Sequence, residues 1–174
     1  MPRSPGATAC RNAAERPNLG THVAWVAWSD DGEFASGRYS RAHELRFDGG
    51  AVVRGSSSPD VVPPPLSDPA GVDPEEALIA SVSACHMLWF LNLAHEAGLV
   101  VTGYRDQAEG SMERVGRGKM AITRIVLRPA IVFSGREPDP AELAALHHEA
   151  HERCFIANSL RTEISVEPPL AADG

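Results

Sequence analysis

Several features are scarce in this chain, and each scarcity argues against a class of protein. Its 174 residues include three cysteines, a small and odd number that does not suit a secreted scaffold held by disulfides. Lys plus Arg number 16 against 23 for Asp plus Glu, so the net charge of −7 disfavours a nucleic-acid binder. We also see no apolar run of roughly 18 residues that could span a membrane, and no apolar stretch of a secretory signal near the N-terminus. The sequence therefore predicts a cytoplasmic protein without nucleic-acid or membrane partners.

The composition is that of a globular domain. Apolar residues make up 43% of the chain and charged residues 22%, which allows a packed core. The length suits one domain of usual size. Residues 1–20 are rich in Pro, Ala and Arg and have no periodic pattern, so we expect a flexible N-terminal tail followed by a single domain at 21–170.

The pattern of apolar residues predicts strands and two helices. Asp73-Pro74 begins a helix that continues to about Glu96, and Asp139-Pro140 begins another that continues to about Cys154. The expected strands are 23–28, 38–47, 51–54, 104–114, 119–128, 130–133 and 161–167. We expect 104–114 and 119–128 to form a hairpin that 130–133 extends. This order predicts an α+β fold with mainly antiparallel pairing.

Each predicted helix carries one cysteine on its apolar stripe. Cys85 lies more than two turns inside the first helix, and Cys154 ends the second. If the helices pack together, the two thiols could meet, with one attacking a substrate and the other resolving the product. The alternative is that both are buried as small hydrophobic residues, which is common for free cysteine. Cys10 falls in the tail and is interpreted as incidental.

A reactive cysteine needs a nearby positive charge, and Arg41 is the candidate. Strand alternation would place Arg41 on the apolar face, where it needs an anionic partner; at a sheet edge it would simply reach solvent. Glu75 either complements the helix dipole or binds Arg41. Glu75 and Cys85 lie ten residues apart, about 15 Å along a straight helix. Arg41 could serve both only if the helix breaks or two subunits contribute, which favours a homodimer.

A histidine cluster raises the alternative of a metal site. His147, His151 and Cys154 can share one helix face, with His148 beside them. No obvious fourth ligand exists, and the segment also fits a polar helix surface, so we expect no metal. His86 follows Cys85 but points roughly 100° away around the helix, so it is interpreted as a neighbour rather than a general base.

Three segments carry a resemblance to a known family. Residues 73–86, read as DPEEALIASVSACH, resemble the pattern NPEELLAASLSACH, with the same spacing from Glu75 to Cys85. Residues 150–159 resemble the second-cysteine region of the same proteins, and 39–43 resemble the segment with their active-site arginine. From about Thr21 to Pro168 the chain thus resembles the OsmC/Ohr family of thiol-dependent hydroperoxide reductases. Asp73 and Phe155 depart from its usual Asn and Pro.

The resemblance implies antiparallel sheets wrapped around two central helices in an intertwined homodimer. It implies that Cys85 is the peroxidatic thiolate, that Cys154 is the resolving thiol, and that Arg41 and Glu75 form an ion pair beside the Cys85 sulfur. The expected activity is reduction of organic hydroperoxides in an oxidative stress response, through a Cys85 sulfenate and a Cys85–Cys154 disulfide.

The expected partners follow from this chemistry. An external dithiol, either a lipoylated protein or a small thiol, would recycle the disulfide, and no metal, flavin or haem would be needed. We expect an apolar substrate pocket lined by Leu78, Val82, Leu88, Trp89 and Phe155. The alternative is a non-catalytic OsmC-like protein that binds or senses a small apolar ligand.

Overall fold

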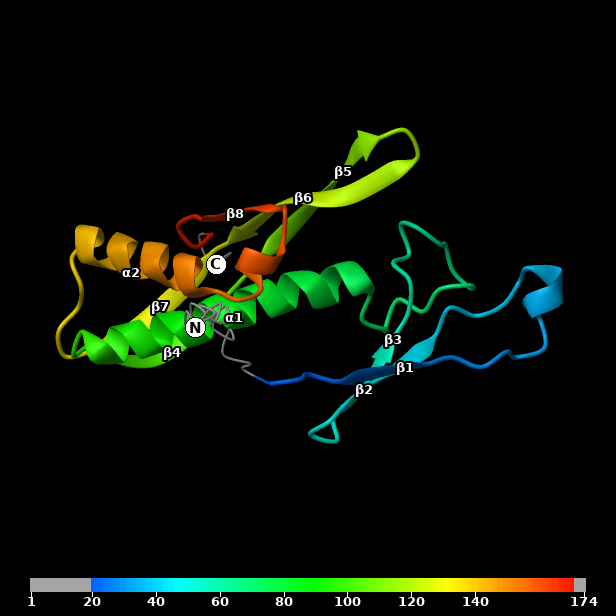
Figure 1. Ribbon diagram of the computed structural model, residues 1–174, viewed down its shortest axis with the longest axis horizontal. Helices are drawn as coiled ribbons and strands as arrows, with labels where there is room; N and C mark the ends of the chain where they lie inside the picture. Colours follow the sequence, from blue (N-terminus) through cyan, green and yellow to red (C-terminus); the bar gives the residue numbers. More distant parts are fainter. Residues whose placement is uncertain (1–19, 171–174) are drawn as a thin grey trace, which may run out of the picture.

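The structure is a computed structural model that describes residues 20–170 (Figure 1). The expected tail, with Cys10, lies outside the described residues apart from Gly20. The elements in chain order are β1 (Ala24–Ala27), η1 (Phe34–Ser36), β2 (His43–Phe47), β3 (Val52–Gly55), α1 (Pro74–Glu96), β4 (Val100–Asp106), β5 (Glu109–Gly116), β6 (Lys119–Leu127), β7 (Pro129–Ser134), α2 (Pro140–Arg153), η2 (Ala157–Ser159) and β8 (Glu163–Val166). The predicted α+β fold is confirmed.

Both helices begin where the sequence predicts. At the start of α1, the Asp73 carboxylate accepts a hydrogen bond from the Glu76 backbone, and the Glu76 carboxylate accepts one from the Asp73 backbone. This reciprocal capping box satisfies two N–H groups that would otherwise lack a partner. At the start of α2, the Asp139 carboxylate accepts hydrogen bonds from the backbone N–H groups of Ala141 and Glu142.

The strands differ from the prediction in their pairing. They form three sheets, ordered β1-β2-β3, β4-β7 and β5-β6-β8. The expected strand 104–114 is divided between β4 and β5, and β7 pairs with β4 instead of extending the β5–β6 hairpin. β8 runs parallel to β6. Residues 38–42 are not strand, so the alternation expected to place Arg41 on an apolar face does not extend to it.

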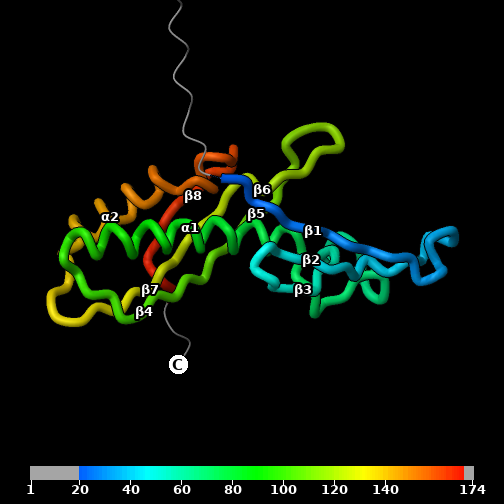
Figure 2. The backbone as a smooth tube through the Cα atoms, turned by 60° about the horizontal axis from the view of Figure 1, so that its bottom comes forward, coloured from blue at the N-terminus to red at the C-terminus, as the bar shows by residue number. Residues whose placement is uncertain are grey.

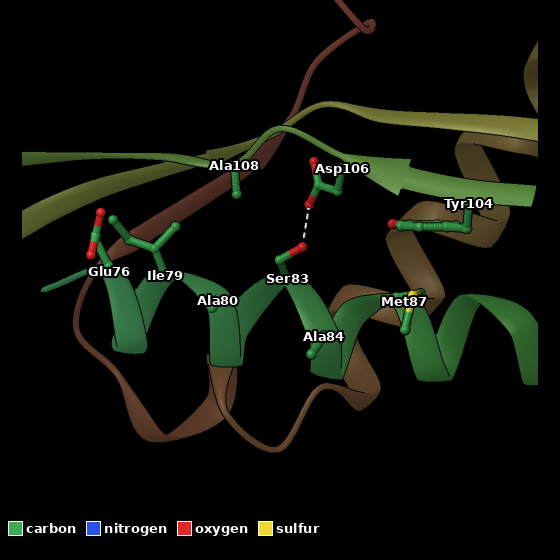
Figure 3. A pocket seen from close by; sticks show the side chains of 9 residues that line it. All are labelled: Glu76, Ile79, Ala80, Ser83, Ala84, Met87, Tyr104, Asp106 and Ala108. Carbon is green, nitrogen blue, oxygen red and sulfur yellow. Dashed lines mark hydrogen bonds between the residues drawn. The ribbon is translucent and has the colours of Figure 1, made fainter. Parts of the chain in front are cut away.

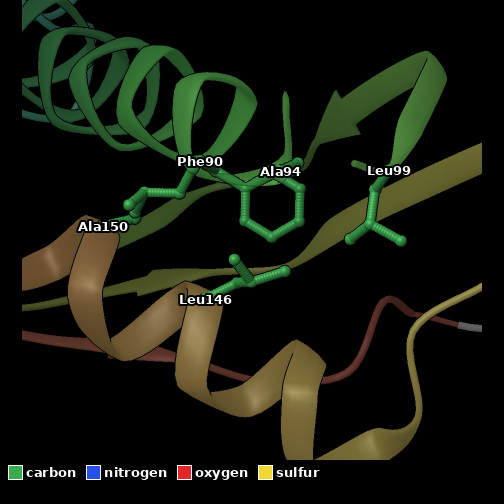
Figure 4. Close-up of a cluster of buried hydrophobic side chains, with 6 residues drawn as sticks. Phe90, Ala94, Leu99, Leu146 and Ala150 are labelled. Carbon is green, nitrogen blue, oxygen red and sulfur yellow. The ribbon is translucent and has the colours of Figure 1, made fainter. Parts of the chain in front are cut away.

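The core lies where α1 packs against α2 and the sheets. One cluster, drawn in Figure 4, joins the two helices and the residue before β4, and its buried members are Phe90, Leu93, Ala94, Leu99, Leu146 and Ala150. A second cluster packs the earlier part of α1 on β6 through Val82, Ile125 and Leu127. The two helices that carry the cysteines are thus held directly against each other.

The β1-β2-β3 sheet extends past the N-terminal end of α1 as an arm (Figures 1 and 2). Large apolar side chains of this arm are exposed, namely Val23, Trp25, Val26, Trp28, Phe34, Phe47 and Val52. Apolar side chains gathered on a surface usually mark a place where another surface binds. In a single chain the apolar surface of the arm is therefore exposed to solvent. A homodimer would bury this surface, and the homodimer stays a prediction.

α1 is long and apolar enough to cross a membrane by length and composition alone. The expectation that no segment meets this test is therefore wrong. α1 packs against α2, β4, β5 and β6, and its residues contribute to both core clusters. We interpret it as the central helix of the folded domain, because the core helix of such a domain meets the same test.

Candidate active site

The two cysteines, distant in the sequence, meet between the helices. Cys85 lies in α1, Cys154 is the C-cap residue of α2, and neither is in a disulfide. The Cys154 thiol interacts with the Cys85 side chain, and this interaction raises the pKa of Cys154. The backbone N–H of Ala157 donates to the Cys154 sulfur at 3.3 Å, which fixes that side chain from the other direction. The structure thus brings together the two thiols that the sequence singled out.

The environment of the two thiols differs. Cys154 is 1% exposed, whereas Cys85 is partly exposed. Burial raises the pKa of Cys154, and its interaction with Cys85 raises this pKa further. The N–H groups of Ile156 and Ala157 oppose the shift only in part. Cys154 therefore keeps its proton at neutral pH, which leaves Cys85 as the candidate nucleophile.

An open cleft of about 840 Å³ lies over Cys85. Three expected pocket residues line it: Leu88, Trp89 and Phe155. The rings of Trp89 and Phe155 meet edge to face with centroids 5.7 Å apart. The remaining lining residues are His22, Ser81, Ala84, Asn92, Ile156 and Ser159. The cleft is mainly apolar near the sulfur, with polar groups that the sequence did not single out.

Two expected pocket residues lie elsewhere. Val82 is fully buried in the cluster formed with β6, and neither Val82 nor Leu78 lines the cleft. Leu78 and Val82 lie seven and three positions before Cys85, a helical spacing that predicts a shared stripe. Because α1 is apolar around most of its circumference, spacing alone could not separate the core face from the cleft face.

Arg41 lies outside the cleft of its own chain. Its guanidinium stacks on the Tyr39 ring, 3.6 Å from the centroid, and also donates to the Tyr39 carbonyl. Tyr39 in turn contacts Trp28 and Phe34, so an aromatic cluster on the arm holds the cation. The backbone N–H of Arg41 donates to the Leu66 carbonyl at 2.8 Å. Sequence reasoning missed this support; the only signal for it was the presence of Trp28, Phe34 and Tyr39 near Arg41 in the chain.

Arg41 and Glu75 do not form an ion pair within the chain. Among the described residues 20–170, neither has an ion-pair partner within 4.0 Å. α1 is a single helix over Pro74–Glu96 and does not break between Glu75 and Cys85. Of the two routes that could bring Arg41 to both Glu75 and Cys85, the one that needs a broken helix is therefore excluded.

The histidines do not form a metal cluster. Within the described part of the chain, no group of three or more His, Cys, Asp or Glu side chains is arranged to hold a metal ion. Nδ1 of His147 is hydrogen-bonded to Nε2 of His86 at 3.0 Å, and the Cys154 thiol interacts with Cys85 without a disulfide. Burial lowers the pKa of His86 to about 4 and also lowers that of His147.

A smaller cavity of about 410 Å³ lies between α1 and β4–β5 (Figure 3). Here the Ser83 hydroxyl donates to Asp106 at 2.5 Å, as the dashed line in Figure 3 shows. The second Asp106 oxygen accepts from the Arg128 backbone at 2.6 Å. Both carboxylate oxygens are thus occupied, and this cavity contains no thiol, so we assign the redox chemistry to the cleft over Cys85.

A family model described as OsmC-like protein matches residues 67–168, which contain α1, both cysteines and all of the later strands. The chain belongs to the OsmC-like family. A curated relative, peroxiredoxin OsmC of Escherichia coli strain K12, is 28% identical to this OsmC-like chain over 97 residues, covering 56% of the chain and 66% of the relative. The alignment thus spans slightly less than two thirds of that relative's length.

Solved structures agree with this OsmC-like fold. An OsmC-like protein of unknown function from Vibrio cholerae is 46% identical, with a TM-score of 0.83 over 86% of this chain and 99% of that one. An organic hydroperoxide resistance protein from Legionella pneumophila is 17% identical, with a TM-score of 0.64 over 87% of this chain and 99% of that one. The second likeness shows the fold alone.

Proposed function

We propose that this OsmC-like protein is a cysteine-based peroxidase that reduces organic hydroperoxides to alcohols. The observation that carries the proposal is the direct contact of a partly exposed Cys85 with a buried, protonated Cys154 below an apolar cleft. A redox role agrees with the family and with the name peroxiredoxin that its curated relative carries.

In the first step the Cys85 thiolate attacks the distal oxygen of the hydroperoxide. The O–O bond breaks, the alkoxide takes a proton and leaves as alcohol, and Cys85 becomes a sulfenic acid. In the second step the Cys154 sulfur attacks the Cys85 sulfur, hydroxide leaves as water with the proton that Cys154 gives up, and a disulfide forms. An external dithiol, lipoylated or small, then reduces the disulfide to two thiols and is itself oxidised.

The cleft supports an organic substrate rather than hydrogen peroxide. Leu88, Trp89 and Phe155 surround the approach to Cys85, and transfer of an apolar group from water to such a surface is favourable by roughly 25 cal/mol per Å². Hydrogen peroxide has no apolar group that could gain this energy.

We also propose that the active assembly is a cytoplasmic homodimer in which the arm of one subunit supplies Arg41 to the cleft of the other. The exposed apolar arm and the unbroken α1 favour this arrangement over a complete site in one chain. Because Glu75 and Cys85 of one unbroken helix lie about 15 Å apart, the Glu75 that pairs with this Arg41 would come from the subunit that supplies the arm, and the pair would form on assembly beside the Cys85 sulfur of the other subunit.

The mass of the intact protein after one equivalent of cumene hydroperoxide tests the proposal. We expect a loss of two hydrogens, with Cys85 linked to Cys154 in the peptide map and release of one equivalent of alcohol. Cys10 serves as an internal control, because it should remain alkylatable. An unchanged mass with cumene hydroperoxide left intact would instead favour the alternative, a non-catalytic protein that binds an apolar ligand in the same cleft.

A further inference from the structure

His86 and His147 form a buried pair that the proposed chemistry does not use. His86, in α1, is 1% exposed, and its Nε2 lies 3.0 Å from Nδ1 of His147 in α2. The two rings are nearly parallel, with an angle of 11° and centroids 5.4 Å apart. Phe90 stacks on His147 with a centroid distance of 4.6 Å. One hydrogen bond therefore crosses the interface between the two helices, inside an aromatic stack.

This bond lies close to both sulfurs. His86 directly follows Cys85 in α1, and His147 lies two turns before Cys154 in α2. The bond thus joins the helix that carries Cys85 to the helix that carries Cys154. Among the described residues, this is the only hydrogen bond between a side chain of α1 and a side chain of α2. The contact of the two thiols is separate from it.

The physical reason for a directional bond here is the geometry of a disulfide. The two sulfurs must come within about 2.05 Å with a torsion near 90°, so small shifts of one helix against the other matter. Apolar packing between helices is not directional. A buried hydrogen bond is directional, and its loss leaves a polar atom without a partner in the core. It therefore resists sliding that apolar contacts would allow.

The charge state of the pair fits this role. Burial keeps both imidazoles neutral at pH 7, and a neutral imidazole has one donor nitrogen and one acceptor nitrogen. One ring can therefore donate and the other accept without an added proton. The other charged or titratable groups that act on the pair are His151 of α2 and Asp106 of β4.

We propose that the hydrogen bond between His86 and His147 sets α1 against α2 so that Cys154 meets Cys85, which makes these histidines positioning residues for disulfide formation. The inference rests on the proposed function, because it assigns a purpose to the Cys85–Cys154 disulfide. It adds two residues that neither touch the substrate nor react.

The test is the effective concentration of the two thiols, measured at pH 7.5 in glutathione buffers of graded redox potential. In this equilibrium two protein thiols are oxidised to a disulfide while one oxidised glutathione is reduced to two thiols. The fraction of the Cys85–Cys154 disulfide is read from trapped tryptic peptides. This readout does not depend on any peroxide, so it separates the positioning role from peroxidase activity.

Three variants make the comparison specific. His147→Phe keeps the aromatic stack and removes the bond, and we expect the effective concentration to fall about tenfold, which corresponds to 1.4 kcal/mol. His147→Asn places an amide oxygen near the position of Nδ1 and should restore a value near that of the wild type. Leu146→Ala, in the same helix interface, should lower the melting temperature and leave the effective concentration within about twofold.

The inference is overturned if His147→Phe leaves the effective concentration unchanged, or if Leu146→Ala lowers it equally. It is also overturned if the wild type forms no disulfide at any glutathione ratio. A wild type that forms the disulfide here but does not reduce cumene hydroperoxide would refute the proposed peroxidase and leave the positioning role standing. If His147→Phe does not fold, His86→Phe removes the same bond from the other helix.

Discussion

The Cys154 thiol interacts with the Cys85 side chain across the interface of two helices, and this interaction raises the pKa of Cys154. This contact gives the two thiols different tasks. The buried partner keeps its proton, and the partly exposed partner faces a cleft that a substrate can enter. A resolving thiol that already touches the reacting sulfur would need no large movement to close the disulfide.

The first prediction concerns that division of tasks. Cys154→Ser should leave one stoichiometric reaction with cumene hydroperoxide, because Cys85 can still become a sulfenic acid but nothing resolves it. Dimedone trapping followed by peptide mapping should place the label on Cys85, and turnover with a dithiol should be lost. Cys85→Ser should abolish both reactions. Full peroxidase activity in Cys85→Ser would refute the assignment of the nucleophile.

The second prediction concerns Arg41. Arg41→Gln should slow oxidation of Cys85 by about tenfold or more, because a guanidinium near the sulfur favours the thiolate. Arg46→Gln is the matched control on the same arm, since Arg46 is exposed and pairs with Glu44. Stopped-flow kinetics with excess hydroperoxide measures both rates. Equal rates of Cys85 oxidation in the two variants would show that Arg41 does not act on Cys85.

Mixing the slow variant Arg41→Gln with the inactive variant Cys85→Ser tests whether Arg41 acts across subunits. A dimer of one Arg41→Gln chain and one Cys85→Ser chain contains one intact site only if Arg41 of the second chain serves Cys85 of the first. We expect refolded mixtures to contain sites that react at the wild-type rate, which is about tenfold faster than the sites of Arg41→Gln alone. These faster sites should be absent if each Arg41 serves the cysteine of its own chain.

The third prediction is that the arm holds the homodimer together. Trp25 is 52% exposed in the single chain, and burying such a side chain contributes about 2 kcal/mol. Trp25→Asp should therefore raise the dimer dissociation constant by more than tenfold in sedimentation equilibrium. Ser36→Asp, at the polar tip of the same arm, should have little effect. A wild type that sediments as a monomer at micromolar concentration would refute the dimer.

How far the sequence predicted this structure depends on how local each signal is. Asp73-Pro74 and Asp139-Pro140 located both helix starts, because a cap needs only the few residues around it. The contact of Cys85 with Cys154 needed the family resemblance, because no spacing rule relates residues on separate helices. The cleft face of α1 was predicted incompletely: Leu88 lines it, whereas Val82 lies in the core.

Strand pairing and buried polar contacts were the least accessible. β7 pairs with β4, although β5 and β6 lie between these two strands in the chain. Nothing in the sequence of 130–133 distinguishes β4 from the neighbouring hairpin as the partner. His86 was interpreted as a mere neighbour of Cys85, because its partner lies on another helix. Such contacts are set by tertiary packing and carry no periodic signal.

The fourth prediction concerns the substrate. Leu88 lines the cleft and is 63% exposed. Leu88→Ser should lower kcat/KM for cumene hydroperoxide about threefold to tenfold, because an apolar contact is lost, and should leave the value for hydrogen peroxide nearly unchanged. Val132→Ser, exposed on β7, is the control. An equal loss for both peroxides would argue against substrate contact at Leu88.

The fifth prediction is a loss of stability in acid that originates at His86. Burial, followed by the charges of His147 and His151, lowers the pKa of His86 from 6.5 to about 4 in the folded protein. The unfolded chain therefore binds a proton first as the pH falls, so the stability due to neutral His86 is complete above pH 6.5 and is lost progressively toward pH 4. This contribution of His86 to the free energy of unfolding is about 3 kcal/mol at most. Chemical unfolding at pH 7.5, 6, 5 and 4 measures this loss.

The variant His86→Leu/His147→Leu isolates this contribution. It removes both buried imidazoles, so its free energy of unfolding should fall less between pH 6.5 and 4 than that of the wild type, even if it is less stable at pH 7.5. Carboxylates that titrate in the same window remain in both proteins and cancel in the comparison. Parallel pH profiles would refute the prediction, because they would mean that the pair has the same pKa values in the folded protein as in the unfolded chain.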